Sequence, residues 1–176
     1  MTLSLGRDIL NFMYFYVINE IMKILTHPDK GLSSRSKPVD INDITSLRMK
    51  KLAADMVKMM LKADGAGLAA PQIGRSLRLA VINTKDGPLI IFNPKFKKKS
   101  LTKEWGEEGC LSVPGYFGEV RRHKKITCEY FNEKGEKKIL NAKGLLARVI
   151  QHETDHLDGI LFIAKARNLK NILDRV

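Results

Sequence analysis

A short run of metal-binding residue types near the C-terminus limits the folds that this chain can adopt. Residues 151–156 read Gln-His-Glu-Thr-Asp-His. On an α-helix, residues four apart lie on one face, one turn from each other, so the imidazoles of His152 and His156 can reach a single metal ion. Glu153 follows the first histidine directly. Two histidines leave a site incomplete, so the fold has to bring a further ligand to this helix.

The third ligand is expected upstream of this helix. No histidine follows His156 and no glutamate follows Glu153. The layouts in which a zinc peptidase takes its third ligand from downstream therefore do not apply. The upstream residues with soft donor atoms are His27, Cys110, His123 and Cys128.

Among these donors, Cys110 is the strongest candidate. It lies in EEGCLSVPG, between a glycine that permits close backbone approach and a Val-Pro-Gly turn. A thiolate held on such a loop is a strong metal ligand. His27 precedes a proline near the start of the chain, which is typical of a surface loop. His123 stands in RRHKK, where four neighbouring cations would repel a divalent metal ion. Cys128 alternates inward in ITCEY and is interpreted as a small buried hydrophobe.

Three motifs in a fixed order make the sequence resemble the peptide deformylase family. These metal-dependent hydrolases remove the formyl group from the N-terminal methionine of new polypeptides in bacteria and organelles. The family carries a Gly-x-Gly-Leu-Ala-Ala-x-Gln loop, a Glu-Gly-Cys-Leu-Ser segment and a Gln-His-Glu-x-x-His helix. This chain has GAGLAAPQ at 65–72, EGCLS at 108–112 and QHETDH at 151–156. One HExxH motif is a moderate signal, whereas all three motifs in order are specific.

The resemblance implies a catalytic metal site. Cys110, His152 and His156 would hold one divalent ion, with water in the open fourth position. Fe(II) is the expected metal, and Zn, Ni or Co are the alternatives. Glu153 would act as general base toward the water and then as acid toward the leaving amine.

The resemblance also implies which residues meet the substrate. The side chain of Gln72 and the backbone N–H of Leu111 would stabilise the oxyanion of the tetrahedral intermediate. Gly67 would offer its backbone to an extended substrate, as in strand addition. The methionine side chain would enter an apolar pocket, although ordinary core positions would show the same apolar spacing. The residues predicted to contact substrate are Ala66, Gly67, Gly109, Arg122, Leu145 and Val149.

A net charge of +12 over 176 residues restricts the partners of the protein. Such a surface favours an anionic neighbour: RNA, anionic lipid or an acidic substrate. We expect a weak, salt-sensitive attraction to the ribosome, near nascent formyl-Met peptides, without specific readout of nucleic acid. Only two cysteines occur, which argues against a disulfide-stapled secreted scaffold. The bacterial cytoplasm is the expected location, with an organelle as the alternative.

One metallohydrolase domain is expected over residues 22–176. Residues 1–21 include the apolar stretch ILNFMYFYVINEI, which is too short and too interrupted to span a bilayer. No small-residue cleavage site follows it. We interpret these residues as an uninformative extension without stable membrane insertion, and a membrane-surface anchor is the alternative.

The apolar pattern predicts an α+β fold, with short antiparallel or mixed sheets around a central metal-binding helix. A first helix is expected over residues 42–63, capped by Asn42 or Asp43, with its methionines facing the core. The metal-binding helix is expected to close at Gly159. Residues 164–176 are interpreted as a short basic tail helix.

Short β-branched runs predict the strands. Residues 77–83 and 88–94 are expected as strands, and KFKKKS at 95–100 as a basic turn. Residues 126–140 are expected to form a hairpin that turns at Glu-Lys-Gly-Glu.

Two other functions fit parts of the sequence. A basic RNA-binding protein with a closed zinc site would use Cys110, Cys128, His152 and His156 as its four ligands. A metal-dependent deacetylase or peptidase on the same scaffold would need room for more than a formyl hydrogen. The metal content of a Cys128 variant distinguishes the RNA-binding protein from a deformylase, because only the closed zinc site uses Cys128 as a ligand. Comparing formylated with acetylated peptides as substrates distinguishes the deacetylase or peptidase.

Overall fold

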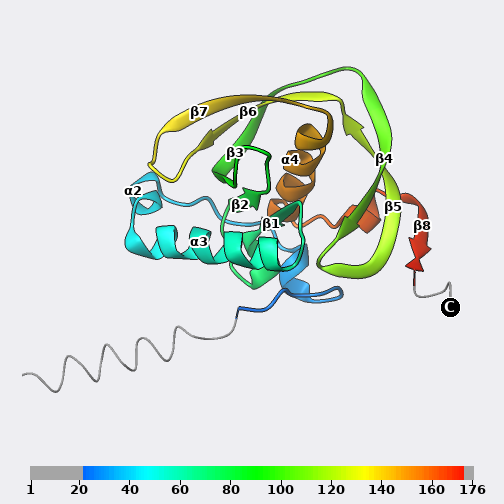
Figure 1. Ribbon diagram of the computed structural model, residues 1–176, viewed down its shortest axis with the longest axis horizontal. Helices are drawn as coiled ribbons and strands as arrows, with labels where there is room; N and C mark the ends of the chain where they lie inside the picture. Colours follow the sequence, from blue (N-terminus) through cyan, green and yellow to red (C-terminus); the bar gives the residue numbers. More distant parts are fainter. Residues whose placement is uncertain (1–21, 173–176) are drawn as a thin grey trace, which may run out of the picture.

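The computed structural model describes residues 22–172 and consists of two antiparallel β-sheets with helices packed on them (Figure 1). The expectations for residues 1–21, and for the end of the tail beyond 172, lie outside the described residues. No helix within the described part is long and apolar enough to cross a bilayer. The predicted α+β class is confirmed.

The larger sheet has five strands and the smaller sheet has three. The five-stranded sheet runs in the order β1 (Gly67–Ala69), β2 (Leu79–Ile82), β3 (Leu89–Lys99), β6 (Lys125–Phe131) and β7 (Lys137–Lys143). The three-stranded sheet runs in the order β4 (Lys103–Cys110), β5 (Val113–His123) and β8 (Arg167–Asn171). The helical elements are η1 (Lys30–Ser33), α2 (Ile41–Ile44), α3 (Leu47–Lys62), η2 (Ala70–Ile73), α4 (Gly144–Leu157) and η3 (Phe162–Ala164).

The helix predicted over 42–63 is in fact two helices, α2 and α3. Its predicted caps, Asn42 and Asp43, are wrong: Asp40 caps α2, and Ser46 caps α3 by accepting a hydrogen bond from the Met49 N–H at 3.3 Å. The sequence signal was ambiguous because several residues in this stretch can cap a helix. The methionines of α3 do face the core, as predicted.

The basic turn predicted at 95–100 is wrong, because Lys95–Lys99 continue strand β3. Phe96 lies opposite Cys128 of β6 and packs on the core, whereas Lys95 and Lys97–Lys99 are exposed. The register against β6 shifts between Phe96 and Lys98, so Lys97–Lys99 do not follow strict alternation. The lysine-rich sequence therefore lacked the period-2 pattern by which a strand is recognised.

Two glycines end elements where the sequence predicted. Gly135, with φ of 75°, turns the β6–β7 hairpin at Glu-Lys-Gly-Glu. Gly159, also with φ of 75°, follows the last turn of α4, and a Cβ there would meet the backbone of Ser33 at 2.8 Å. L-residues with side chains rarely adopt this backbone conformation, so glycine is the natural choice at both positions.

The predicted basic tail helix is also wrong. After η3 the chain forms β8, which pairs with β5 so that Tyr116 lies opposite Asn171. The guanidinium of Arg167 lies 3.6 Å from the ring centroid of Trp105 and donates a hydrogen bond to Glu119 at 3.0 Å. Cation–π and charge-assisted contacts of this kind are available only when β8 adds to the sheet.

Helix α4 contacts strands of both sheets (Figure 1). Its residues Ala147, Ile150 and Leu157 are fully buried in the core of the five-stranded sheet. Because side chains of a helix follow a 3.6-residue period, burying this stripe turns His152 and Glu153 toward β1 and β4. The hydrophobic core therefore orients the candidate ligands.

Replacing the cap of α3 tests the corrected helix boundary. Ser46→Ala removes the acceptor for the Met49 N–H and is expected to lower the free energy of unfolding by about 1 kcal/mol. Asn42→Ala, at an exposed position of α2, is the matched control and should change the free energy of unfolding by less than about 0.5 kcal/mol. Urea denaturation measures both. An equal decrease in the two variants would contradict the boundary.

Candidate metal centre

Three side chains from two elements converge on one point. Cys110 ends β4, and His152 and His156 lie one turn apart on α4. Their candidate ligand atoms all lie within 4.8 Å of one another, and Cys110 Sγ is 3.2 Å from His156 Nε2. Within residues 22–172 this is the cluster of thiol and imidazole groups that could hold an ion, and it unites the three predicted ligands.

The donor set fits a divalent transition metal. Metal–sulfur and metal–nitrogen bonds of about 2.0–2.3 Å place neighbouring donors of a tetrahedral ion roughly 3.3–3.6 Å apart. The 3.2 Å between Cys110 Sγ and His156 Nε2 is close to this value, and all three donor atoms lie within 4.8 Å of one another. One thiolate and two imidazoles leave a fourth position open. The Ser112 N–H donates to Cys110 Sγ at 3.4 Å, which stabilises negative charge on the sulfur.

A buried carboxylate, Glu108, fixes the orientation of His152. Glu108 Oε2 lies 2.9 Å from His152 Nδ1, so the Nε2 atom of the ring is directed toward Cys110 and His156. A carboxylate bound to the outer nitrogen of a histidine ligand sets its tautomer and raises its basicity. Glu108 and Cys110 are two apart on β4, so both side chains lie on the face toward α4. That spacing is the signal in the sequence that could have identified Glu108, which was not predicted.

Two arginines neutralise Glu108. Arg122 donates two hydrogen bonds to its carboxylate, at 2.9 and 2.8 Å, and Arg148 donates one at 2.8 Å. Arg122 also pairs with Asp155. Burial tends to raise the pKa of Glu108, but the hydrogen bonds from Arg122 and His152 outweigh burial and hold the pKa well below its usual range. Glu108 is therefore a charged group in the protein interior.

This network bears on the prediction that Arg122 contacts substrate. Its side chain is 5% exposed, is engaged by Glu108 and Asp155, and does not line the cavity beside the metal ligands. The surroundings of Arg122 thus do not support a contact with substrate. They assign its guanidinium to the support of Glu108.

The two histidines differ in protonation. Burial and the nearby His152 lower the pKa of His156 well below its usual value, which keeps this ring neutral, as a ligand requires. Burial also acts to lower the pKa of His152, but hydrogen bonds with Cys110 and Glu108 outweigh it and raise the pKa to about 10. A cation at the same ring nitrogen would replace that proton, so metal binding and protonation compete at His152.

Glu153 lies beside the candidate ligands. Its side chain is buried, and its Oε2 atom accepts no hydrogen bond within the described residues. The carboxylate lies against Gly67 of β1, where a Cβ would come 2.8 Å from Glu153 Cγ. Burial raises the pKa of Glu153 to about 7. A carboxyl group with a pKa near neutrality can both accept and release a proton.

Gln72 is held rigidly next to Cys110. Its Oε1 accepts a hydrogen bond from the Ala69 N–H at 2.8 Å, which fixes the direction of the amide. Its Nε2 donates to Ser112 Oγ at 3.1 Å and lies 3.6 Å from Cys110 Sγ. Leu111, the residue after Cys110, is half-buried at the same place. Both predicted oxyanion donors therefore lie next to the thiol.

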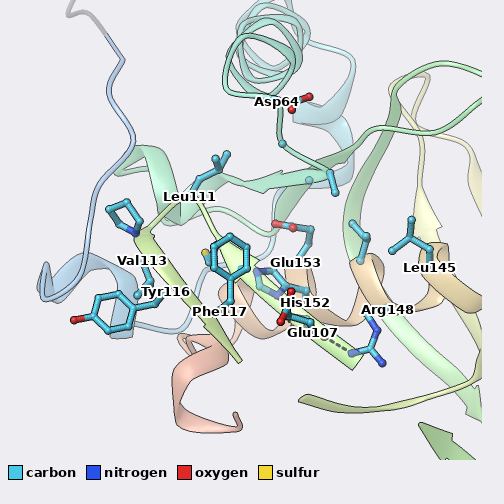
Figure 2. Close-up of a pocket in the computed structure, with 18 of the residues that line it drawn as sticks. Asp64, Glu107, Leu111, Val113, Tyr116, Phe117, Leu145, Arg148, His152 and Glu153 are labelled. Carbon is cyan, nitrogen blue, oxygen red and sulfur yellow. Dashed lines mark hydrogen bonds and ion pairs between the residues drawn. The ribbon is translucent and has the colours of Figure 1, made fainter. Parts of the chain in front are cut away.

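A cavity of about 470 Å³ opens beside this cluster (Figure 2). Figure 2 shows His152 and Glu153 at its base, with Leu111 on one side and Leu145 and Arg148 on the other. Five of the six predicted substrate residues line it: Ala66, Gly67, Gly109, Leu145 and Val149. Phe117, Val113 and Arg148 line it too, and none of these was predicted.

The other soft donors considered in the sequence lie elsewhere. Cys128 is buried among apolar residues of β6, and burial raises the pKa of its thiol to about 11. His123 Nδ1 lies 2.6 Å from the carbonyl oxygen of Ser100. Neither residue belongs to the metal-binding cluster, and nor does His27. The structure thus does not bring together the four ligands of a closed zinc site.

Comparisons with known proteins agree on one family. The family model described as polypeptide deformylase matches residues 21–172. Peptide deformylase 1 of Bacillus subtilis (strain 168) is 44% identical over 147 residues, which are 82% of this chain and 89% of the relative. The peptide deformylase of Rhizobium meliloti (strain 1021) is 43% identical over 155 residues, or 85% of this chain and 87% of the relative.

Solved structures give the same result. A peptide deformylase from Thermotoga maritima has a TM-score of 0.79 and 38% identity, and the match covers 85% of this chain and 99% of that one. A class I type b peptide deformylase from Acinetobacter baumannii, solved with Met-Ala-Ser bound, has a TM-score of 0.79 and 32% identity over 82% of this chain and 98% of that one.

Neutralising Glu108 tests the support of the metal ligands. Glu108→Gln leaves Arg148 without a carboxylate partner within residues 22–172 and the buried Arg122 with Asp155 alone, and it is expected to lower the free energy of unfolding by about 3–5 kcal/mol. It should also weaken metal binding by about 10- to 100-fold, because His152 loses its carboxylate partner. Chemical denaturation and metal titration measure these effects.

The matched control for this variant is Glu107→Gln. Glu107 precedes Glu108 on the same strand, is exposed, and forms no ion pair within residues 22–172. The same change of charge there should alter the free energy of unfolding by less than about 0.5 kcal/mol. Equal effects at the two positions would show that Glu108 does not support the site.

Proposed function

The chain belongs to the polypeptide deformylase family, and we propose that its residues remove the N-formyl group from newly made polypeptides by metal-assisted hydrolysis. The observation that carries the proposal is the convergence of Cys110, His152 and His156 beside the carboxylate of Glu153, whose Oε2 atom has no hydrogen-bond partner within residues 22–172. Three ligands with an adjacent acid–base group are typical of a hydrolytic metal site.

We propose one divalent metal ion, Fe(II), held by Cys110, His152 and His156. A thiolate with two imidazoles also suits Zn, Ni and Co, which are the alternatives. When bound, the ion would lower the pKa of a water molecule and polarise the formyl carbonyl. The remaining steps depend on residues of the chain.

Glu153 is proposed as the general base and acid. Its Oε2 atom has no hydrogen-bond partner among the described residues, so it is free to accept a proton from the attacking water. Attack forms a bond from the water oxygen to the formyl carbon. The formyl C–N bond then breaks as Glu153 passes the proton to the amine nitrogen. The products are formate and a peptide with a free N-terminus.

The oxyanion is proposed to receive two hydrogen bonds from the chain. The Nε2 group of Gln72, oriented by the Ala69 N–H, is one donor, and the N–H of Leu111 is the other. Donors fixed before the reaction stabilise developing charge without reorganisation. We propose that the backbone of Gly67 and Gly109 binds the extended substrate.

The methionine side chain is proposed to enter the cavity near Ala66, Leu145 and Val149. All three residues line the cavity beside the metal ligands, and Val149 lies one turn before Glu153 on α4. In place of the substrate contact predicted from the sequence, we propose that Arg122 positions Glu108, and through it His152.

We propose that the enzyme acts in the bacterial cytoplasm, on nascent formyl-Met peptides close to the ribosome. The bacterial relatives support this location, and the net charge of +12 supports a salt-sensitive attraction to ribosomal RNA. We also propose that the catalytic domain begins near residue 22, since the family model starts at residue 21.

Formate release tests the reaction and its general base together. Iron-loaded, anaerobically purified protein is expected to release formate from a formyl-Met tripeptide. Glu153→Gln is expected to keep the metal and to lose activity by about 100-fold or more, because general acid–base catalysis contributes a factor of this order. Formate production and metal content are the two measurements. Substantial activity in this variant would remove Glu153 from its role.

Two cysteine variants test the ligand set. Cys110→Ala is expected to lose both the metal and the activity, whereas Cys128→Ser should retain the metal, because Cys128 lies in the core and outside the cluster. Elemental analysis of the purified proteins measures the metal content. Metal loss in Cys128→Ser alone would favour the closed zinc site instead.

Comparison of acyl groups tests the substrate class. Formylated peptides are expected to react and the matched acetylated peptides to react much more slowly, since the acetyl methyl group has to fit where a hydrogen fits. Steady-state rates for the two peptides measure the preference. Equal rates would favour a deacetylase on the same scaffold.

A further inference from the structure

A second cavity, away from the metal ligands, is lined mainly by cations. Its volume is about 370 Å³, and it lies between the ends of β3, β4 and β5 and one side of α4. None of the three metal ligands lines it. Its positively charged lining residues are Lys99, Lys103, Arg121, Arg122 and Lys165, and the one carboxylate is that of Asp155. We refer to it as the basic cavity.

Three of these cations are not neutralised. Arg122 and Lys165 both pair with Asp155, the latter at 2.6 Å. Lys99, Lys103 and Arg121 are exposed and form no ion pair within residues 22–172. Like charges around one hollow repel each other, and a bound anion would remove that repulsion.

The cations of the basic cavity come from four separate segments of the chain. Lys99 ends β3, Lys103 begins β4, Arg121 lies near the end of β5, and Lys165 follows η3. The fold therefore gathers positive side chains here that are far apart in the sequence.

We propose that the basic cavity binds the phosphodiester backbone of RNA. A single phosphate would need only a few of these cations, whereas their spread over β3, β4, β5 and the segment after η3 suits several phosphates. The net charge of +12 adds long-range attraction to such a polyanion. This binding is independent of base sequence because only phosphates are contacted.

The lining of the basic cavity favours RNA over an anionic membrane. Phe96 is its one apolar lining residue, and the Lys99 ammonium lies 4.6 Å from the centroid of that ring. A surface that binds membranes usually inserts several apolar side chains beside its cations. The basic cavity has no such set among the described residues. Lipid binding is therefore an outcome that the test has to distinguish.

The experiment measures binding of the full chain to a fluorescein-labelled oligouridylate by anisotropy, at several salt concentrations. Lys103→Ala/Arg121→Ala is the test variant. Lys50→Ala/Lys62→Ala is the matched control, with the same change of charge on exposed residues of α3, a helix that packs on β1 and β2. The test variant should bind RNA several-fold more weakly. The slope of log affinity against log salt should fall in magnitude by about 1.4, or about 0.7 for each phosphate that is no longer neutralised.

The control should keep the slope and affinity of the unmodified protein. Equal weakening in both variants, or no RNA binding by the unmodified protein, would overturn the proposal. Vesicles of phosphatidylserine and phosphatidylcholine form a second arm. Binding to these vesicles through Lys103 and Arg121, without RNA binding, would also overturn it.

Folding and catalysis are followed in the same preparations. Thermal unfolding establishes that each variant is folded, and Lys103→Gln/Arg121→Gln replaces the alanine pair if that pair is not. The inference rests on the attraction to RNA in the proposed function, for which it names the site, and it does not depend on the metal-assisted mechanism. Formate release without RNA binding would overturn the inference alone, and RNA binding without formate release would overturn only the mechanism.

Discussion

The buried carboxylate of Glu108 links the elements that form the candidate metal centre. It joins β4, which carries it, to Arg122 on β5 and to Arg148 and His152 on α4. Breaking a buried ion pair leaves an uncompensated charge, so these three elements are strongly held in one relative position. The position of the metal ligands is thus set by electrostatics in the interior as well as by packing.

The opposite side of α4 supplies the second constraint. Ala147, Ile150 and Leu157 are buried against the five-stranded sheet, and this fixes the rotation of the helix about its axis. The face of α4 that carries His152 and Glu153 is then directed toward β1 and β4. Gly67 leaves room for the Glu153 carboxylate there, since any larger residue would collide with it. Packing and charge therefore position the same helix from opposite sides.

The site contains two carboxyl groups whose surroundings shift their pKa values in opposite directions. Glu108 is kept ionised by its arginines, whereas the Oε2 atom of Glu153 has no hydrogen-bond donor among the described residues. When the environments of two carboxyl groups shift their pKa values in opposite directions, one group commonly serves as a structural carboxylate and the other as an acid–base group. The basic cavity is lined by Arg122 and Asp155, so the same ion-pair network lies between the metal centre and the surface that we propose for RNA.

Local sequence was enough to predict three side chains that the structure brings together. Cys110, His152 and His156 could be predicted because spacing on a helix and the choice of donor atoms are local properties. The hairpin at Gly135 was predictable for the same reason. The catalytic roles of these three residues and of Glu153 stay predictions. Tertiary structure decided the elements that depend on distant partners. Lys95–Lys99 form a strand because β6 pairs with them. Residues 167–171 form β8 because they pair with β5. Tertiary structure also decided that Arg122 supports Glu108, since a buried ion pair across strands leaves no periodic signal in the sequence.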